Sequence, residues 1–330
     1  MAFSLPVRSE LIVLASPVGD RDDYYQQFAD DIAKFHLHFA EKILAHGDDV
    51  LILSSEKFYD FYAEHLGVEK VILAPMPDIW MRDFTVANTV DPVMFRYSAA
   101  GQGGDQGAAD YVQEMFAVLA EEAGIDFAES DLINDGGNFV DDYAGRVVVS
   151  RKFLKDNKLT EQQARREISK LTGARQVAFI EADEQGGLEH ADGVVSFVDE
   201  NVLLMNDYSE DPDYRDELIG DLKSALPGVQ IHPVVTPYDG SETFDAKFGS
   251  ACGLYTNALV TPERIYFPQF GLDEDAKALQ QVRAATTREV VPVFSQGVCA
   301  LGGGVRCMSL QLRGQAAQRL LRYADRLSDR

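Results

Sequence analysis

The chain has 330 residues, 46% of them hydrophobic and 25% charged, a balance that indicates a globular protein and excludes disorder over most of its length. Asp and Glu number 54 against 30 Lys and Arg, which gives a formal net charge of −24 at pH 7. Such a charge disfavours nucleic acid and anionic membranes as partners and favours approach of a small cationic molecule. An acidic surface that serves only solubility is the alternative.

No apolar run approaches the roughly 20 residues that a membrane helix needs, and the N-terminus shows no secretory signal. The three cysteines, Cys252, Cys299 and Cys307, are too few for a disulfide framework. We therefore expect free thiols in a reducing, cytoplasmic setting.

Strands and helices alternate along the chain. Apolar runs predict strands at 11–15, 50–53 and 71–74, and helical periodicity predicts helices at 22–45 and 56–65. Paired strands are expected within 85–97, 138–149, 194–205 and 259–267. Helices are expected at 108–123, 161–171, 213–225 and 274–285, and an amphipathic helix over 314–330. Single strands are expected at 177–180, 230–235, 289–294 and 305–312.

A unit of hairpin, helix and strand recurs near 85–130, 138–180 and 194–235. A fourth copy fits 257–294, and the first copy is split between the two ends of the chain. Short repeated units predict a closed, radially repeated α/β architecture. Because no Pro/Ser-rich linker separates them, we expect one domain over 1–330. An open α/β sheet is the alternative.

Four polar clusters lie next to predicted strands, where loops commonly carry functional sites. In the first, Trp80 and Arg82 precede Asp83. A carboxylate beside an aromatic face can hold a planar cation, although a core tryptophan next to a surface ion pair would have the same sequence. In the second, Asp135 and Asn138 flank two glycines, which indicates either a close backbone approach or an ordinary turn.

In the third cluster, His190 and Asp192 stand two residues apart, so on extended backbone they would share a face. Histidine titrates near neutral pH and can shuttle protons; a surface His–Asp pair is the alternative. One histidine and one aspartate make a poor metal site, and the chain has no H-E-x-x-H string, so no metal is expected.

The fourth cluster, residues 302–307, reads GGGVRC and ends at Cys307. A nucleophilic cysteine needs open backbone around it, which the glycines would provide. A buried, inert thiol is the alternative for Cys307, and it is the interpretation we favour for Cys252 and Cys299.

In their order and spacing the clusters resemble the agmatine deiminase and bacterial peptidylarginine deiminase family, a branch of the guanidine-modifying enzymes. The family motifs W-x-R-D, E-G-G-N, G-H-x-D and G-G-G-x-x-C correspond to residues 80–83, 135–138, 189–192 and 302–307. Residues 250–257 and 267–271 are similar to two further family segments.

The resemblance implies the pentein fold, an α/β-propeller of five ββαβ-type repeats around a pseudo-fivefold axis with the site in the central channel. It implies a single catalytic domain that deiminates a guanidine to a ureido product and ammonia, without a metal or an organic cofactor. Cys307 would be the nucleophile and His190 the general acid/base, while Asp83 and Asp192 would hold the guanidinium. The motifs also place substrate contacts at six positions, namely Trp80, Arg82, Asp135, Gly137, Asn138 and Gly303.

Agmatine is the leading substrate on this resemblance, followed by free arginine or a peptidyl arginine. An amidinotransferase and an inactive binding protein on the same fold are alternatives, and a homo-oligomer is compatible with the sequence. The chain departs from the family pattern at Phe84 and Thr85, at Asp135, at Arg306 and over 95–101. These departures keep the four catalytic residue types, and several lie where the substrate tail would be recognised.

Overall fold

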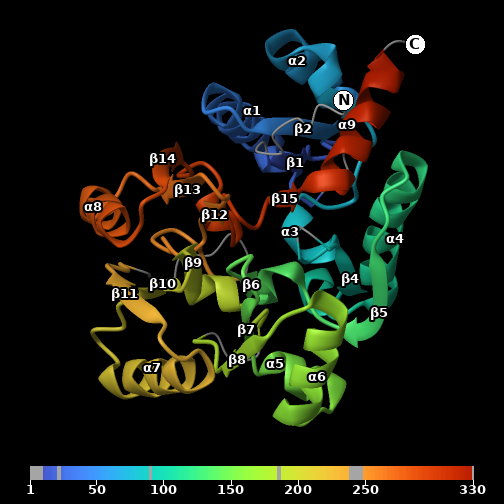
Figure 1. The fold of residues 1–330 in the computed structure, drawn as a ribbon. Coiled ribbons are helices and arrows are strands. Elements are labelled where there is room, and N and C mark those ends of the chain that lie inside the picture. The colour runs from blue at the N-terminus through green and yellow to red at the C-terminus, as the bar shows by residue number, and fades with distance from the viewer. Residues whose placement is uncertain (1–9, 21–23, 89–90, 184–186, 238–247, 329–330) are drawn as a thin grey trace, which may run out of the picture.

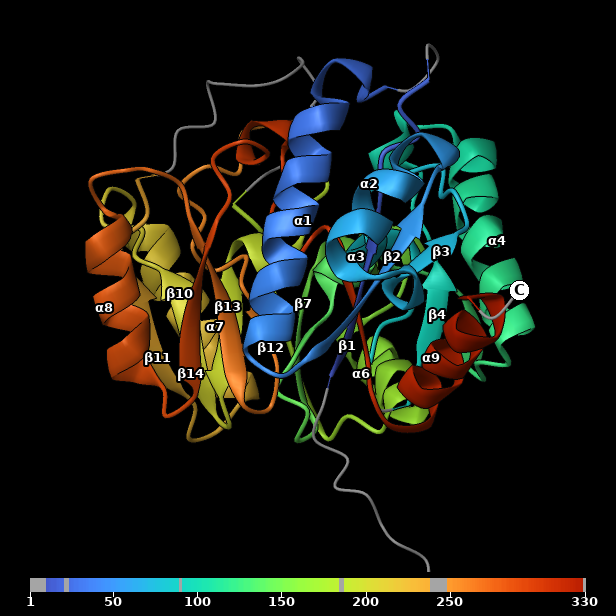
Figure 2. The same ribbon diagram turned by 90° about the horizontal axis from the view of Figure 1, so that it is seen from above.

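The computed structural model describes the chain except for residues 1–9, 21–23, 89–90, 184–186, 238–247 and 329–330 (Figures 1 and 2). The described part is an α/β fold with five separate sheets, none of which closes on itself. In Figure 1 the long helices lie on the outside of the molecule and the sheets lie nearer its centre. No helix in the described part is both long and apolar enough to cross a bilayer.

The first sheet joins segments from the two ends of the chain. Its strand order is β15-β1-β2-β3, in which β15 is antiparallel to β1 and the other neighbours are parallel. The elements of this part are β1 (Leu11–Ala15), α1 (Ala29–Ala45), β2 (Asp49–Ser54), α2 (Glu56–Leu66), β3 (Val71–Leu73) and β15 (Ser309–Leu312), followed by α9 (Gly314–Ser328).

Three further sheets share one topology, in which an antiparallel strand pair is followed by a helix and a strand parallel to the second. The first is β6 (Val140–Asp141), β7 (Arg146–Ser150) and β8 (Gln176–Ile180), with α5 (Lys152–Asn157) and α6 (Glu161–Thr172). The second is β9 (Val195–Asp199), β10 (Val202–Asn206) and β11 (Gln230–Val234), with α7 (Pro212–Ala225). The third is β12 (Leu259–Val260), β13 (Arg264–Gln269) and β14 (Glu289–Phe294), with α8 (Asp275–Ala285).

The remaining sheet pairs β4 (Val93–Arg96) with β5 (Ala128–Ile133) in parallel, connected by α4 (Gln106–Ala123). The strand predicted at 85–90 is reduced here to one isolated bridge between Ala87 and Val93, and residues 89–90 lie outside the described residues. The sequence did not predict β5, because its acidic, half-exposed residues form no apolar run. The short helices α3 (Met81–Phe84) and α5 were missed as well, since each is too short to show a helical period.

Helix α6 illustrates how local sequence determines the ends of an element. The Thr160 hydroxyl accepts a hydrogen bond from the Gln163 backbone, and the Gln163 side chain accepts one from the Thr160 backbone, which is a capping box. Ala164 and Ile168, four residues apart, are its buried side chains. The helix ends at Gly173, whose φ of 73° suits a residue without a Cβ.

Strand β1 is buried on both faces and divides two apolar clusters. Ile12 and Leu14 pack with residues of α1, such as Phe39, whereas Leu11 and Val13 pack in the cluster that includes α4 and α9. This alternation follows from the period of two along a strand. A continuous apolar run is typical of a strand that is covered on both sides.

The expectation of free thiols is wrong for two of the three cysteines, because Cys252 and Cys299 form a disulfide with their Cα atoms 4.9 Å apart. The 47-residue separation gave no local signal that these positions meet. Cys307 is free and buried. Because structural disulfides persist mainly in oxidising surroundings, the cysteine content no longer supports a reducing compartment.

Replacing both Cys252 and Cys299 by alanine should lower the free energy of unfolding by about 2–4 kcal/mol, since the bridge restricts the unfolded chain. Urea unfolding monitored by circular dichroism measures the loss, and wild-type protein treated with a dithiol provides the comparison. Equal midpoints for the oxidised wild type and the double variant would show that the bridge does not stabilise the fold.

His36 in α1 is fully buried, and neither ring nitrogen has a hydrogen-bond partner among the described residues. Burial disfavours the imidazolium and lowers the pKa of His36 from 6.5 to about 3. The folded protein therefore keeps His36 neutral where the unfolded chain takes up a proton. Its contribution to stability is complete above pH 6.5 and declines as the pH falls from 6.5 towards 3.

The variant His36→Leu should therefore lose less stability on acidification than the wild type. The difference in slope should approach about 1.4 kcal/mol per pH unit between pH 6 and 4. Chemical denaturation at several pH values measures it. An NMR spectrum of the folded protein that shows His36 as imidazolium at pH 5 would contradict the explanation.

Candidate active site

Cys307 lies in a turn before β15, which is why the strand predicted at 305–312 begins only at Ser309. In this turn the Met308 backbone donates to the Gly304 carbonyl. Asn257 contacts Cys307 twice: its Nδ2 donates to Sγ at 3.0 Å, and its Oδ1 accepts from the Cys307 backbone at 3.4 Å. The sulfur is thus buried and held in a defined position.

Gly303 makes room for an aromatic side chain beside the thiol. A Cβ at this position would collide with the Trp80 ring and lie 3.0 Å from the Cys307 Cβ. The indole nitrogen of Trp80 donates to the Tyr25 hydroxyl at 2.6 Å. The glycine run therefore brings the tryptophan of the first cluster against the cysteine of the fourth.

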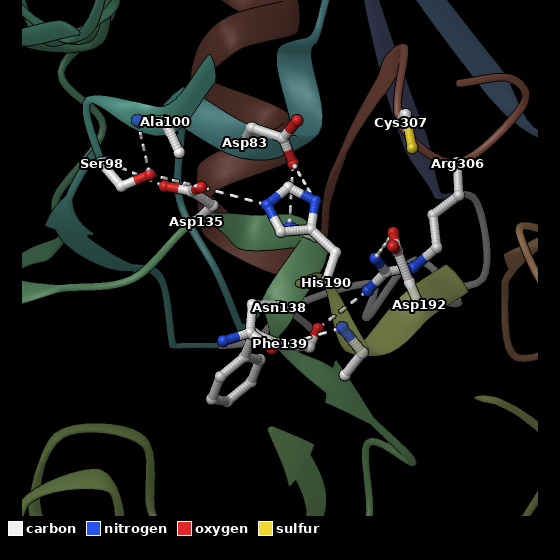
Figure 3. A network of polar contacts seen from close by, with 12 residues as sticks. Asp83, Ser98, Ala100, Asp135, Asn138, Phe139, His190, Asp192, Arg306 and Cys307 are labelled. Carbon is white, nitrogen blue, oxygen red and sulfur yellow. Dashed lines mark hydrogen bonds and ion pairs between the residues drawn. The ribbon is translucent and has the colours of Figure 1, made fainter. Parts of the chain in front are cut away.

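His190 stands between two carboxylates (Figure 3). Its Nε2 is 3.0 Å from Asp135 Oδ2, and its Nδ1 is 3.7 Å from Asp83 Oδ1. Asp135 is itself fixed by the backbone and the hydroxyl of Ser98, each at 2.8 Å. Asp83 accepts a hydrogen bond from the Gly137 backbone at 3.0 Å.

The buried charges alter one another's protonation. Burial alone would lower the pKa of His190, but Asp83, Asp135 and Asp192 outweigh it and raise that pKa to about 10. Burial raises the pKa of Asp83 to about 7, although His190 opposes the change. The imidazole is therefore protonated at neutral pH and can act as a proton donor.

The glycines of the second cluster allow this close arrangement. A Cβ on Gly137 would lie 2.5 Å from His190 Nδ1 and 2.7 Å from Asp83 Oδ1, too close for either atom to stay in place. Asn138 lies behind the histidine, where its Oδ1 accepts from the Ser150 backbone at 2.8 Å and the Ala191 backbone at 3.2 Å. Its amide thus ties β7 to the segment that carries His190.

Two buried arginines lie next to the cluster. Arg306 donates from Nη1 to Asp192 Oδ2 at 2.5 Å and from Nη2 to the Phe139 carbonyl at 2.8 Å. Arg82 is also buried, and its Nε and Nη2 have no hydrogen-bond partner among the described residues. Burial and the nearby Arg306 lower the pKa of Arg82 to about 10. The Arg82 backbone donates to the Cys307 carbonyl at 3.0 Å.

A cavity of about 380 Å³ adjoins the cluster of charged groups and the Cys307 thiol. Of the ten predicted site residues, five line it: Trp80, Asp83, His190, Asp192 and Cys307. The other five, Arg82, Asp135, Gly137, Asn138 and Gly303, are not on its wall but contact or support residues that are.

The sequence did not single out several other residues of the cavity wall. Asn257 and Gly302 belong to segments already noted for their similarity to the family, and Tyr97 belongs to the segment 95–101, noted for its departure from the family pattern. Asp183, Tyr208 and Phe248 carried no recognisable signal, because they lie outside these segments and meet only when the units assemble. Among the described residues, no group of three or more His, Cys, Asp or Glu side chains is arranged to hold a metal.

The substitution Asp135→Asn should lower the pKa of His190 by about 1–3 units, because it removes a hydrogen-bonded negative charge. NMR titration of the imidazole resonances measures the shift. Asp110→Asn is the matched control, since Asp110 is exposed and pairs with Arg96 on the surface. If both variants titrate like the wild type, Asp135 does not control the protonation of His190.

Comparisons with known proteins agree with the motifs. The family model for Porphyromonas-type peptidyl-arginine deiminase matches residues 8–312. A protein of Marinomonas sp. (strain MWYL1) named "Putative agmatine deiminase" is 24% identical over 282 residues, which cover 74% of this chain and 76% of that protein.

Solved structures show the same fold. An agmatine deiminase of C. jejuni superposes with a TM-score of 0.75 at 16% identity and covers 93% of this chain and 94% of its own. The agmatine deiminase of Enterococcus faecalis superposes with a TM-score of 0.72 at 16% identity and covers 94% of each chain. The resemblance inferred from the motifs is confirmed: the chain belongs to the Porphyromonas-type peptidyl-arginine deiminase family, whose members are hydrolases that act on carbon–nitrogen bonds.

Proposed function

We propose that this protein hydrolyses a guanidine compound to a ureido product and ammonia through a covalent thiouronium intermediate on Cys307. The observation that carries the proposal is one cavity lined by a thiol, an imidazole and two carboxylates that come from three distant parts of the chain. The reaction requires a nucleophile, a general acid/base and groups that bind a cation. The thiol, the imidazole and the carboxylates can serve these functions in that order.

The substrate guanidinium is planar and cationic, so carboxylates on two sides can hold its N–H groups and place its carbon near the sulfur. Burial raises the pKa of the Cys307 thiol well above its usual value, and the charges of Asp192 and Asp83 add to the effect. The free enzyme therefore holds a thiol. A bound cation offsets the two carboxylates and favours release of the thiol proton to solvent, where it protonates the ammonia that is released later.

In the first half-reaction the thiolate attacks the guanidinium carbon and a C–S bond forms. The His190 imidazolium gives its proton to a leaving amino group, the C–N bond breaks, and ammonia departs. In the second half-reaction neutral His190 takes a proton from water, which attacks the same carbon. As the C–S bond breaks, the hydroxyl proton of the tetrahedral adduct passes to the departing sulfur, which restores the Cys307 thiol and releases the ureido product with its alkyl chain intact.

Agmatine is the leading substrate. Three carboxylates line the cavity, those of Asp83, Asp183 and Asp192, and no lysine or arginine is among its described lining residues. The ammonium group of agmatine suits such a wall, whereas the carboxylate of free arginine would find no lysine or arginine among the described lining residues. The named agmatine deiminases among the similar proteins point to the same choice. A peptidyl arginine, which lacks that carboxylate, is the second candidate, supported by the family description.

We also infer that residues 1–330 form one catalytic domain with the five-repeat propeller arrangement of the penteins. The repeated order of an antiparallel pair, a helix and a parallel strand supports this inference. The first repeat would then combine β15 with β1 from the two ends of the chain.

Wild-type protein should convert agmatine to its ureido product and ammonia with a kcat/KM at least ~10-fold higher than for free arginine. The reason is that the carboxylate of arginine would lie against the carboxylates of the cavity wall. Cys307→Ala should reduce turnover by ~10³-fold or more, since it removes the nucleophile. A colorimetric ureido assay over agmatine, arginine, methylated arginines and arginyl peptides measures both effects, and circular dichroism checks folding.

Full ammonia release by Cys307→Ala from every guanidine tested would refute the covalent mechanism. Formation of a new guanidine only when glycine or ornithine is added would identify an amidinotransferase. Tight calorimetric binding without turnover would identify a binding protein.

A further inference from the structure

Arg306 is hydrogen-bonded to one oxygen of the Asp192 carboxylate, which is also a proposed binding group for the substrate. Its Nη1 donates to Asp192 Oδ2, and the described residues offer Asp192 Oδ1 no hydrogen-bond donor. Asp192 is 2% exposed and lines the cavity, whereas Arg306 is 8% exposed and is not among the cavity-lining residues. Figure 3 shows the guanidinium of Arg306 beside the Asp192 carboxylate and the Cys307 sulfur on the same side of the cluster. The protein thus holds this carboxylate from one side with a guanidinium of its own.

The two bonds of Arg306 connect the chain segments that form the site. The residue precedes Cys307 in the chain, reaches Asp192 across 114 positions, and reaches the Phe139 carbonyl across 167. Phe139 directly follows the 3-10 turn at Gly136–Asn138, whose backbone holds Asp83. One planar side chain therefore connects the nucleophile segment to the segment that carries Asp192 and to the one that carries Asp135. A lysine could supply the charge but could not make both bonds as one rigid fork.

Arg306 also determines the charge of the cluster. When all three carboxylates, Asp83, Asp135 and Asp192, are ionised, they face the His190 imidazolium and the Arg306 guanidinium. The cluster then carries one net negative charge, which the single positive charge of the substrate guanidinium balances. Without Arg306, Asp192 would be a buried carboxylate lacking its hydrogen-bonded cation, which is costly. Other charged or titratable groups face this region from neighbouring elements, namely Arg82 on α3, Asp141 on β6, Tyr143 after β6 and Cys307 itself.

We propose that Arg306 is a positioning residue that acts through Asp192: it holds Oδ2, turns Oδ1 towards the substrate guanidinium, and supplies the positive charge that lets Cys307 ionise when substrate is bound. This inference rests on the proposed function and assigns a role to a residue that departs from the family pattern. A carboxylate held between a fixed guanidinium and a substrate guanidinium positions the substrate carbon more firmly than a free carboxylate would.

Three single variants test the role, namely Arg306→Met, Arg306→Lys and Asp192→Asn, together with the double variant Arg306→Met/Asp192→Asn. Arg306→Met should lower kcat by ~10–100-fold without raising KM, because the lost charge and orientation act on the reaction step while the more negative site still attracts a cation. The acid limb of its pH profile should move to higher pH, since a cation near the thiol has been removed. Arg306→Lys keeps the charge and should retain the wild-type limb while recovering part of kcat.

A second measurement does not depend on turnover. Cys307 is the free thiol once Cys252 and Cys299 are bridged, so its alkylation by iodoacetamide reports thiolate formation. At a fixed pH, Cys307 of Arg306→Met should be alkylated ~10-fold more slowly than Cys307 of the wild type, which corresponds to a rise of about one unit in the thiol pKa. Cys307 of Arg306→Lys should react at nearly the wild-type rate. In the Asp192→Asn background, removal of Arg306 should have less effect on kcat and on the midpoint of the pH profile than in the wild type, because the two residues act as a pair.

Unchanged kcat, pH profile and alkylation rate in Arg306→Met, alongside normal wild-type turnover, would overturn the inference and leave the proposed function intact. Higher kcat and lower KM in that variant would also overturn it, since they would show that Arg306 competes with the substrate for Asp192. If the wild type turns over no guanidine, the proposed function fails. In that case equal alkylation rates of Cys307 in the wild type and in Arg306→Met would still show that Arg306 has no role in thiol ionisation.

Discussion

The site depends on the burial of several opposite charges in one place. His190 is held between Asp135 and Asp83, and Asp192 is held by Arg306, all largely shielded from water. A buried charge is tolerated only when it is paired and hydrogen-bonded, so each acid needs a partner at short range. Much of the surrounding backbone serves this requirement, from Gly137, which leaves room for the imidazole, to Ser98, which holds Asp135 with two hydrogen bonds.

The same electrostatics explains how one site can lower its own reactivity until substrate arrives. Burial, together with the nearby acids, keeps Cys307 a thiol, while the same acids outweigh burial at His190 and keep it protonated. A cationic head group changes this balance, because its charge compensates the acids next to the sulfur. On the proposed mechanism the nucleophile would therefore form mainly when its target is present, and the imidazolium proton would be available for the leaving ammonia.

The sequence contained enough to predict the alternation of strands and helices, the repeated unit and the four clusters, since each is written in neighbouring residues. Five of the ten chosen residues line the cavity, and the others contact or support them. Contacts between units could not be predicted. The bridge between Cys252 and Cys299 and the ion pair of Arg306 with Asp192 join residues 47 and 114 positions apart, and neither has a local pattern. Strand β5 and helices α3 and α5 were missed because short or acidic segments lack the periodicity on which the prediction relied.

The most direct test of the covalent mechanism is to trap the enzyme during turnover of agmatine by acid quench and to locate any adduct by peptide mass spectrometry. We expect a modification on the peptide that contains Cys307, with the mass of the whole substrate less one ammonia. Slower hydrolysis in His190→Gln should increase the trapped fraction if attack still occurs. An adduct that lacks the alkyl chain would contradict deimination, and product formation with no adduct on Cys307 under any quench time would contradict the covalent route.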